Sequence, residues 1–593
     1  MAVETTAGPR GGQAGRTILE LWQHATTRDS ASPAFLVKEG KEWREVGWSE
    51  AGDRVDELAA GFLGLGIAKG DRVAILSRTR LEWTLSDLAL TSIGAIVVPI
   101  YETSSRDDCA HVLSDSGAKA VICEDEKQFE KTRGLDLPAL QLTISFEQVD
   151  EELLLLERVA EQGRAFAGER PAALADARSS ISPEDPLTFI YTSGTTGAPK
   201  GCVLTNGGWA AVVESIKQIE NLMGPGDVVL LFLPLAHNFA RLVQFVGIGA
   251  GFTVAFCPDI NRVARALAEV RPTIFPSVPR LYERVYTTVH GRLMQETGVK
   301  GRLVQSSLAA GRRAAAVRQR GGRPGPLLAL QLRLADRLVF SKIKERFGGR
   351  LKHAVSGGAP LSAEIIEFFA ACGVLILEGY GLTETTSACT VNRPDNYRFG
   401  TVGTAVPGVE VALADDREIK VRGATLFQGY HGNDAATEEV LTDDGWLLTG
   451  DIGTIDDAGF VTIVDRKKEL IVTSGGKKIS PNNLENALKA SPYVSQALVV
   501  GDNRSYLAAL IYADPAETAK ATQGEDGARE LIQGVIDEIN SRHGPVEQIK
   551  RFTLLAREFS QEEGEITPTL KIRRKICEAH FRDEIERLYG PQR

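Results

Sequence analysis

Short apolar runs alternate with longer helix-like stretches over the first two-thirds of the chain, and this alternation strongly constrains the fold. Strands are predicted over Arg72–Leu76, Ala95–Ile100, Lys119–Cys123, Leu187–Tyr191, Asp227–Leu233, Phe252–Phe256 and Thr273–Phe275. Many of these runs are rich in Val and Ile and lack polar alternation, which is typical of strands buried on both faces. Helices are predicted between them, for example over Trp48–Leu63 and Arg80–Ser92. The pattern therefore predicts an α/β fold with layered helices and a largely parallel sheet.

The character of the sequence changes near Asn392 and again near Asp465. Between these points Gly, Pro and Asp are frequent, and short strands at Val409–Leu413, Glu418–Val421 and Phe460–Val464 indicate a small antiparallel β part over about residues 392–464. Beyond it, helices and strands mix and the chain ends in a charged tail. A chain of 593 residues is too long for one hydrophobic core. We expect an N-terminal domain over residues 1–464 and a smaller α+β C-terminal domain over 465–593.

Composition excludes several classes of protein. The net charge of −10 argues against a nucleic-acid partner. The seven cysteines form no CxxC pair, which predicts neither a disulfide framework nor a zinc site and favours a reducing cytoplasm. No apolar run reaches the roughly 18–20 residues that span a bilayer. The most apolar stretch, Leu242–Cys257, contains Gln244 and three glycines and is predicted to be a buried helix–strand pair, while residues 1–16 are expected to form a tail and not a signal peptide.

Two stretches look like insertions. Ala160–Ser180 is rich in Ala and Arg, and Lys300–Arg323 is basic with no acidic residue. The simplest interpretation of the second is a solvated, partly mobile helix. The alternative is a surface for CoA phosphates or for peripheral contact with anionic lipid at the inner face of the cell membrane. Its basic residues are Lys300, Arg302, Arg312, Arg313, Arg318, Arg320 and Arg323.

A Gly- and Thr-rich loop, Tyr191–Gly201, follows one of the predicted buried strands and reads YTSGTTGAPKG. Its glycines permit a close backbone approach, its N–H groups can form an anion nest, and Lys200 adds a positive charge. The hydroxyl groups come from Thr192, Ser193, Thr195 and Thr196. Lys200 is followed by Gly201, so the loop is not a Walker A sequence. A plain hairpin loop is the alternative, but eleven residues of this type predict a polyphosphate site.

This loop resembles the signature loop of the adenylate-forming superfamily, which groups acyl-CoA synthetases, peptide-synthetase adenylation domains and luciferases. Further motifs match that superfamily in order over roughly residues 187–575. The stretches FLPLAHNFAR, HAVSGGAPL and PTLKIRRK resemble the bacterial long-chain fatty acyl-CoA synthetases in particular. The resemblance implies that a fatty acid reacts with ATP and Mg²⁺ to give acyl-AMP, and that CoA then takes the acyl group. It also implies layered α/β subdomains with a β-barrel-like part and a mobile C-terminal domain.

The resemblance assigns a nucleotide site to three further motifs. Gly357, Gly358 and Ala359 would lie along adenine and Tyr380 would stack on it. Thr383 would reach the α-phosphate, Glu384 would hold Mg²⁺, and Asp451 with Arg466 would bind the ribose. Taken alone, each motif also fits an ordinary turn. The whole predicted set for ATP and AMP is Thr192, Ser193, Gly194, Thr195, Thr196, Gly197, Lys200, Gly357, Gly358, Ala359, Glu378, Gly379, Tyr380, Gly381, Thr383, Asp451, Arg466 and Lys571.

The C-terminal motifs are implied to act by rotation. Residues 465–468 resemble the hinge of the superfamily, with Lys468 at a position that is often Asp. Ser474, Gly475 and Gly476 would line the CoA tunnel in the thioester-forming state. Lys571 would enter the site during adenylation and bridge the substrate carboxylate and the α-phosphate. The predicted catalytic residues are Thr192, Lys200, Glu384 and Lys571.

Acyl specificity is expected to come from apolar walls after the strand that ends at Leu233. By resemblance His237, Phe239 and Gly381 would lie near the carboxylate, and Gly247, Gly249 and Gly251 would leave room for a chain. Core packing is an equally good interpretation of any one of them. Each methylene contributes only about 0.8 kcal/mol, so we expect a preference for medium-to-long chains and not for one length.

Three alternatives stay open at this point. A fatty acyl-AMP ligase would load the phosphopantetheine of a carrier protein in place of CoA, and a luciferase-like oxidase would share the same motifs. A non-catalytic regulatory or binding protein could have the same fold, but retention of Lys200, Glu384, Asp451, Arg466 and Lys571 together argues against it. The sequence leaves the oligomeric state open.

Overall fold

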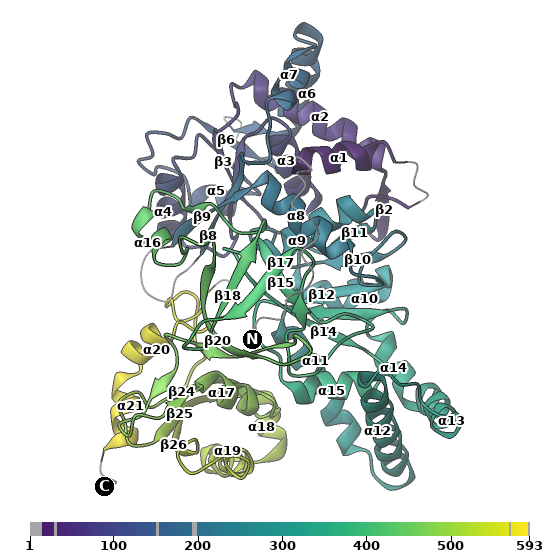
Figure 1. Cartoon of the computed structure of the whole chain (residues 1–593), viewed down its shortest axis with the longest axis vertical. Helices are drawn as coiled ribbons and strands as arrows, with labels where there is room; N and C mark the ends of the chain where they lie inside the picture. Colours follow the sequence, from purple (N-terminus) through teal and green to yellow (C-terminus); the bar gives the residue numbers. More distant parts are fainter. Residues whose placement is uncertain (1–14, 29–31, 150–152, 193–198, 568–570, 591–593) are drawn as a thin grey trace.

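The computed structural model describes residues 15–28, 32–149, 153–192, 199–567 and 571–590, and the expected N-terminal tail lies almost wholly outside these ranges. Two large mixed sheets of eight and nine strands form the body, and a small three-stranded sheet lies near the C-terminus (Figure 1). The predicted α/β class, with a large N-terminal and a smaller C-terminal part, is confirmed.

The eight-stranded sheet contains the strand that precedes the Gly- and Thr-rich loop. Its centre is parallel: β8 (Pro186–Thr192) lies next to β4 (Ile96–Ile100), then β3 (Arg72–Leu76) and β5 (Ala120–Cys123). Most residues of these strands are buried, as their apolar runs predict. The carboxyl ends of the parallel strands therefore meet at one edge, together with the start of the loop.

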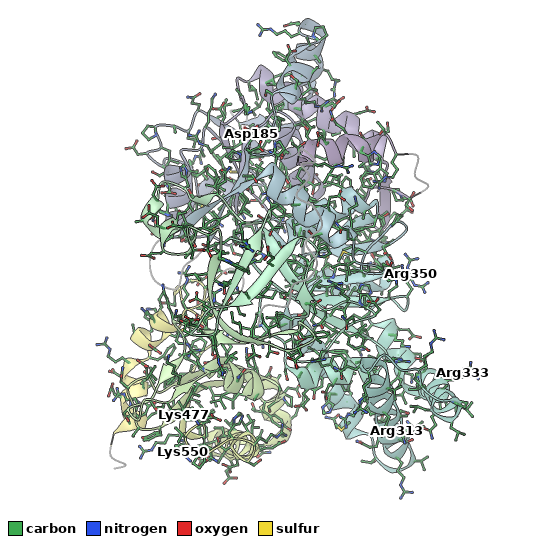
Figure 2. All side chains as sticks on the ribbon, viewed as in Figure 1. Asp185, Arg313, Arg333, Arg350, Lys477 and Lys550 are labelled. Atoms are coloured by element: carbon green, nitrogen blue, oxygen red, sulfur yellow. The ribbon has the colours of Figure 1, made fainter. Side chains whose placement is uncertain are left out.

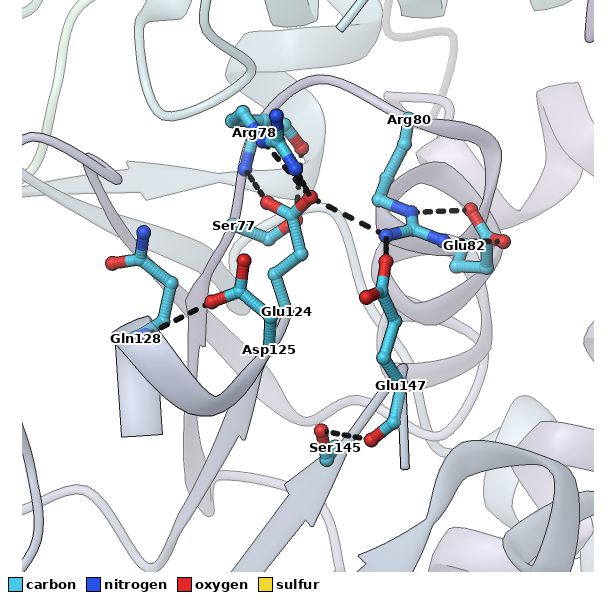
Figure 3. Close-up of polar contacts among 9 residues, drawn as sticks. All are labelled: Ser77, Arg78, Arg80, Glu82, Glu124, Asp125, Gln128, Ser145 and Glu147. Carbon is cyan, nitrogen blue, oxygen red and sulfur yellow. Dashed lines mark hydrogen bonds and ion pairs between the residues drawn. The ribbon is translucent and has the colours of Figure 1, made fainter. Parts of the chain in front are cut away.

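The loops at this edge are tied together by ion pairs (Figure 3). Glu124 follows β5 and is 1 % exposed; it accepts hydrogen bonds from Arg78 Nε at 2.9 Å and Arg78 Nη2 at 2.6 Å. Arg80 contacts Glu124 at 3.3 Å and Glu147 at 2.7 Å. Burial alone would raise the pKa of Glu124, but the hydrogen bonds from Arg78 outweigh it and the pKa is lowered. The edge beside the loop is thus held by a buried, ionised carboxylate.

The Ala- and Arg-rich stretch expected to be an insertion is integrated with the sheet. It forms the end of α6 (Leu156–Glu169) and α7 (Ala173–Ser179), and α6 packs on α2 (Trp48–Gly64). A Cβ on Gly163 would lie 1.9 Å from the carbonyl oxygen of Glu57, so the two helix backbones touch. The small residue Gly163 allows this close helix packing, which the Ala- and Arg-rich composition alone does not reveal.

The nine-stranded sheet carries the second set of motifs. β10 (Val228–Leu231), β11 (Thr253–Phe256), β12 (Ile274–Ser277), β13 (His353–Ser356) and the first part of β14 (Ile376–Leu382) are parallel. The predicted buried helix–strand pair is confirmed as α9 (Asn238–Ala250) followed by β11.

Three long helices join β12 to β13, namely α11 (Pro279–Gln295), α12 (Gly298–Gln319) and α13 (Pro326–Ala335). The α12–α13 pair projects from the body beside the C-terminal part (Figure 1). The prediction of a solvated helix holds for only one face of α12, because the other face packs on α15 (Ala363–Ala371). A Cβ on Gly311 would lie 2.1 Å from the carbonyl oxygen of Ala371, so the two helices are in close contact.

The predicted antiparallel β part is a four-stranded sheet of β17 (Val409–Leu413), β18 (Glu418–Gly423), β20 (Leu447–Ile455) and β21 (Val461–Arg466). Within the described ranges, none of the helices combines the length and apolar content needed to cross a bilayer.

The C-terminal part has a mixed sheet of β24 (Val494–Val500), β25 (Leu507–Ala513) and β26 (Ile549–Leu554). The flanking helices are α17 (Pro481–Lys489), α19 (Gly524–Asn540), α20 (Arg574–His580) and α21 (Arg582–Tyr589). Two hydrophobic clusters fill it, and among the described residues neither contains a member before Ile471. This part therefore has its own core.

Candidate active site

The base of the phosphate-type loop is fixed from both sides. Thr192 ends β8 and pairs with Lys200, which begins β9 (Lys200–Thr205). Tyr191 Oη donates to Asp115 Oδ2 at 2.6 Å, and His111 Nε2 lies 2.9 Å from the carbonyl oxygen of Pro199. The intervening predicted residues Ser193, Gly194, Thr195, Thr196 and Gly197 lie outside the described residues.

Lys200 and Glu384 both contact Tyr430, a residue that the sequence analysis did not predict to belong to the site. Tyr430, in β19 (Gly429–Tyr430), donates its hydroxyl to Glu384 Oε1 at 2.7 Å, and Lys200 Nζ lies 5.1 Å from the centroid of the Tyr430 ring. Burial and the nearby Glu384 carboxylate raise the pKa of Tyr430, so the phenol stays a donor. The antiparallel pairing of β19 with β9 places Tyr430 near Lys200, and a hydrogen bond from Phe427 N to the Glu384 carbonyl at 2.9 Å holds Glu384 close to Tyr430; no local sequence pattern signals these contacts.

Glu384 fits a Mg²⁺ ion that is held mainly by phosphates. Among the described residues no cluster of three His, Cys, Asp or Glu side chains could hold a metal by itself. Mg²⁺ is commonly bound by one or two carboxylates together with substrate phosphate oxygens. A single carboxylate oriented by Tyr430 and placed near Lys200 suits that mode of binding.

The predicted ribose residues form one hydrogen-bonded group. Asp451 Oδ2 accepts from Tyr380 Oη at 2.6 Å, and Asp451 Oδ1 pairs with Arg466 Nε at 2.9 Å. Asp451 is 3 % exposed, whereas 45 % of the Arg466 side chain is exposed. Burial raises the pKa of Asp451, and the charge of Arg466 and the Tyr380 hydrogen bond oppose that shift. The paired strands β20 and β21 place Asp451 directly opposite Arg466.

A cavity of about 70 Å³ joins the predicted adenine and acyl residues. It is lined by His237 and Phe239 at the start of α9, by Gly357 and Gly358, and by the glycines and tyrosine of β14. Ala359 is exposed and is not part of this lining. Apolar side chains complete it, including Leu222, Met223, Leu242, Val243 and Val246.

The expectation that Gly247, Gly249 and Gly251 leave room for an acyl chain is wrong. A Cβ on Gly247 would lie 3.0 Å from the ring of Phe252, and one on Gly249 would lie 2.7 Å from Val213 Cγ1. Gly251 ends α9 with φ +79°, a left-handed conformation that favours glycine. These glycines serve helix packing and termination.

His237 is held neutral at the N-terminus of α9. Its Nδ1 accepts the backbone N–H of Phe239 at 3.2 Å. Burial, with the positive charge of Lys571, lowers the pKa of His237 to about 3. The ring therefore faces the cavity as an uncharged group near neutral pH.

Lys571 reaches the same group from the C-terminal part. Its backbone is held by Thr567, with Thr567 N donating to the Lys571 carbonyl at 2.8 Å and Lys571 N donating to Thr567 Oγ1 at 3.0 Å. The residue keeps solvent-accessible surface, yet the protein around it and the charge of Arg466 lower the pKa of Lys571, while Asp451 and Glu384 oppose the shift. The other PTLK residues before it, 568–570, lie outside the described residues.

A buried carboxylate anchors the segment that carries Lys571. Glu565 is fully buried; it accepts two hydrogen bonds from Arg557 at 2.7 and 2.6 Å and one from Ser560 N at 2.8 Å. His580 Nδ1 lies 2.9 Å from it. Burial would raise its pKa, but the hydrogen bonds from Arg557 prevail and lower the pKa of Glu565 to about 2. Its partners lie within 15 residues in sequence, but no periodic or motif pattern connects them, and sequence reasoning therefore missed it.

The predicted hinge and CoA residues lie apart from this cavity. Lys468 is exposed in the turn after β21, and Asp465 before it accepts hydrogen bonds from Ser480 Oγ and Asn482 Nδ2 at 2.5 Å each. Ser474, Gly475 and Gly476 form the exposed tip between β22 (Ile471–Val472) and β23 (Lys478–Ile479).

Substituting Gly381 by alanine should destabilise the protein by about 3 kcal/mol or more. A Cβ there would lie 1.6 Å from the carbonyl oxygen of Ser387, which has φ +86° and little freedom to move. Gly379→Ala is the matched control, because its nearest neighbour would be 3.4 Å away. Thermal unfolding of both variants measures the difference; equal melting temperatures would contradict the steric argument.

Glu378 should make stability fall as pH rises. Burial raises the pKa of Glu378 from 4.5 to about 8, so the native state keeps a proton that the unfolded state loses above pH 4.5. Its stabilising contribution is thus full below about pH 4.5 and is lost as pH rises through 8. Over that range Glu378→Gln should gain roughly 3–5 kcal/mol relative to the parent chain. The gap in Tm between the two, measured from pH 5 to 9, should widen; a constant gap would show that Glu378 is already ionised.

Comparisons with known proteins agree with this geometry. The model of the AMP-binding enzyme family matches residues 22–431, and that of the AMP-binding enzyme C-terminal domain matches residues 468–593. The chain is 38 % identical over 568 residues to the long-chain-fatty-acid–CoA ligase FadD15 of Mycobacterium bovis, covering 93 % of each chain. It is 32 % identical to the peroxisomal long chain acyl-CoA synthetase 7 of Arabidopsis thaliana, over 92 % of this chain and 82 % of that protein.

Solved structures share the fold. The adenylation domain of a carboxylate reductase from Mycobacterium chelonae superposes with a TM-score of 0.77 at 22 % identity, covering 97 % of this chain and 92 % of that one. The anthranilate CoA ligase AuaEII in complex with anthranoyl-AMP gives a TM-score of 0.75 at 20 % identity, covering 97 % and 99 %. At these identities the likeness concerns the fold alone.

Proposed function

Since the chain belongs to the family of AMP-binding enzymes, we propose that it is a long-chain fatty acid–CoA ligase. It converts a fatty acid and ATP to acyl-AMP and pyrophosphate, and then acyl-AMP and CoA to acyl-CoA and AMP. The observation that carries the proposal is the similarity, over almost the whole chain, to proteins named as long-chain-fatty-acid CoA ligases. Two further observations support it: Tyr430 contacts both Lys200 and Glu384, and Lys571 interacts electrostatically with Asp451 and Glu384.

The chemistry needs positioned charge more than covalent catalysis. A carboxylate oxygen must attack the α-phosphorus of ATP, so two anions have to be brought together. Mg²⁺ held by phosphates and Glu384 would neutralise part of this charge. Lys571 would offset the charge that develops between the carboxylate and the α-phosphate, and Asp451 and Arg466 would hold the ribose. His237 would lie beside the substrate carboxylate, and because it is neutral it would form no ion pair that holds the carboxylate back from reaction.

The arrangement of the C-terminal part fits the adenylation step. Lys571 interacts electrostatically with Asp451 and Glu384, while Ser474, Gly475 and Gly476 are exposed. Bringing the latter to the site for thioester formation would require a rotation of the chain that follows the proposed hinge at Lys468, while Arg466 stays paired with Asp451. Among the described residues, the hydrogen bonds between distant elements of the two parts include those from Arg280 Nη1 to the Ser495 carbonyl at 3.0 Å, from Arg280 Nη2 to Ser495 Oγ at 3.1 Å and from Gln561 Nε2 to the Thr103 carbonyl at 2.9 Å, and a rotation would break them.

A cytoplasmic location fits the cysteines. All seven lie in described ranges, unpaired and buried, as expected in a reducing compartment. Independently of its location, we propose that residues 1–464 form the ATP- and acyl-binding domain and that residues 465–593 form its lid.

The deciding experiment is pyrophosphate release from ATP and Mg²⁺ with acids from acetate to oleate, with and without CoA. We expect release with medium-to-long acids, and AMP with acyl-CoA only when CoA is added. Pyrophosphate with no acyl-CoA would favour transfer to a carrier protein instead. No release with any acid would favour a non-catalytic protein of the same fold.

A further inference from the structure

A row of leucines on α13 and the π-helical turn after it, η2 (Asp336–Phe340), faces solvent. We call Leu327, Leu330, Leu334 and Leu338 the leucine row; their exposed fractions are 80, 57, 55 and 50 %. Spacings of three and four residues place them within an arc of about 80° on a helix of 3.6 residues per turn. They are four of the ten large apolar side chains that are exposed among the described residues, so the exposure is concentrated on one surface.

The leucine row is exposed although the segment that carries it packs firmly against the rest of the protein. Ala335, Val339 and Phe340 on the same segment are buried and face the body of the protein. Arg313 Nη2 on α12 donates to Gln331 Oε1 on α13 at 3.1 Å and helps to hold the two helices together. The fold thus fixes the segment and leaves the leucines outward, and exposed apolar surfaces of this kind mark a partner.

The same hairpin is strongly basic. Residues 297–335 contain eight Lys and Arg side chains and no acidic residue, within a chain whose net charge is −10. All eight are exposed. Two of them, Arg313 and Arg333, are labelled on the projecting helices in Figure 2, and Arg333 with Arg337 is exposed beside the leucine row. Positive charge next to a leucine row matches anionic headgroups above an apolar phase.

We propose that the α12–α13 hairpin docks on anionic membrane surfaces, with the leucine row in the acyl boundary and the arginines on the headgroups. This goes beyond the proposed function and does not depend on it. A soluble anion such as CoA would use the arginines but would leave the leucines exposed. A second copy paired through the leucine row would bring Arg333 and Arg337 against the same charges of its partner.

Flotation with vesicles tests the proposal on the full chain. The protein should float with vesicles of phosphatidylcholine and phosphatidylglycerol in equal parts, much less with phosphatidylcholine alone, and less as salt is raised. Changing the leucine row to serine should weaken binding about tenfold or more. Ile260→Ser is the matched control, because Ile260 is 61 % exposed on a different element, and its binding should not change.

A second variant separates the two contributions. Replacing Arg312, Arg313, Arg318 and Arg320 by glutamine should remove the preference for phosphatidylglycerol while pyrophosphate release with a water-soluble acid is unchanged. Unaltered flotation of the leucine variant, or no flotation of the parent chain, would overturn the proposal. A leucine variant that loses only self-association in analytical ultracentrifugation would show that a second copy covers the row.

Discussion

Lys571→Ala should slow pyrophosphate release by about 10²–10³-fold, the loss expected when one donor to a developing charge is removed. The ammonium group interacts electrostatically with Asp451, Glu384 and His237, so it lies where carboxylate and phosphate charges would meet. Acyl-CoA formation from chemically prepared acyl-AMP should remain close to that of the parent chain, because under the proposed rotation the lysine leaves the site for that step. Single-turnover assays of the two half-reactions measure both rates.

Lys575→Ala is the matched control, since Lys575 is exposed on α20 four residues away. It should leave both half-reactions unchanged. An equal loss in both half-reactions for Lys571→Ala would contradict a role confined to adenylation, and unchanged adenylation would remove Lys571 from the site altogether.

Glu384→Gln should lower the rate of adenylation by about 10²-fold or more and raise the Mg²⁺ concentration needed for half-maximal rate. The amide keeps the shape and can still accept from Tyr430, but it lacks the charge that a hard cation prefers. Tyr430→Phe should have a smaller effect of the same kind, because it removes only the 2.7 Å hydrogen bond that orients the carboxylate. Rates measured across a Mg²⁺ titration separate these outcomes.

Glu438 on α16 (Asp434–Glu438) provides the control, being an exposed carboxylate near Tyr430 along the chain. Glu438→Gln should not change the Mg²⁺ dependence. If Glu384→Gln reduced the rate without shifting that dependence, the carboxylate would act on something other than the metal.

Local patterns predicted the parts of the site that follow directly from a strand. Thr192 and Lys200 end and begin paired strands, because apolar runs and glycine turns set strand ends within one or two residues. Asp451 and Arg466 were singled out by the family resemblance, and their pairing across β20 and β21 is seen only in the structure. Strand predictions such as Arg72–Leu76 and Val409–Leu413 coincide with β3 and β17. Such features depend on neighbours in sequence, so the sequence alone can specify them.

Features that depend on long-range pairing were missed. Tyr430 lies near Lys200 because β19 pairs with β9, and near Glu384 because Phe427 N donates to the Glu384 carbonyl at 2.9 Å. Glu565 was missed for another reason: Arg557 and His580 are close to it in sequence, but the fold of an irregular loop brings them together. Gly247 and Gly249 were assigned to ligand space, although the side chains of Phe252 and Val213 lie against them. The basic stretch was recognised, but the leucine row needed the helix orientation that only packing defines.

The separate cores also determine how the molecule should melt. Two apolar clusters confined to residues 471–588 and a larger one that ends at Ile463 indicate two cooperative units. A calorimetric scan of the ligand-free chain would then contain two overlapping endotherms, and one Tm would describe neither of them. A nucleotide bound by Asp451 on one unit and Lys571 on the other would couple the unfolding of the two units and reduce the difference between their melting temperatures. That difference would then report on closure of the C-terminal lid.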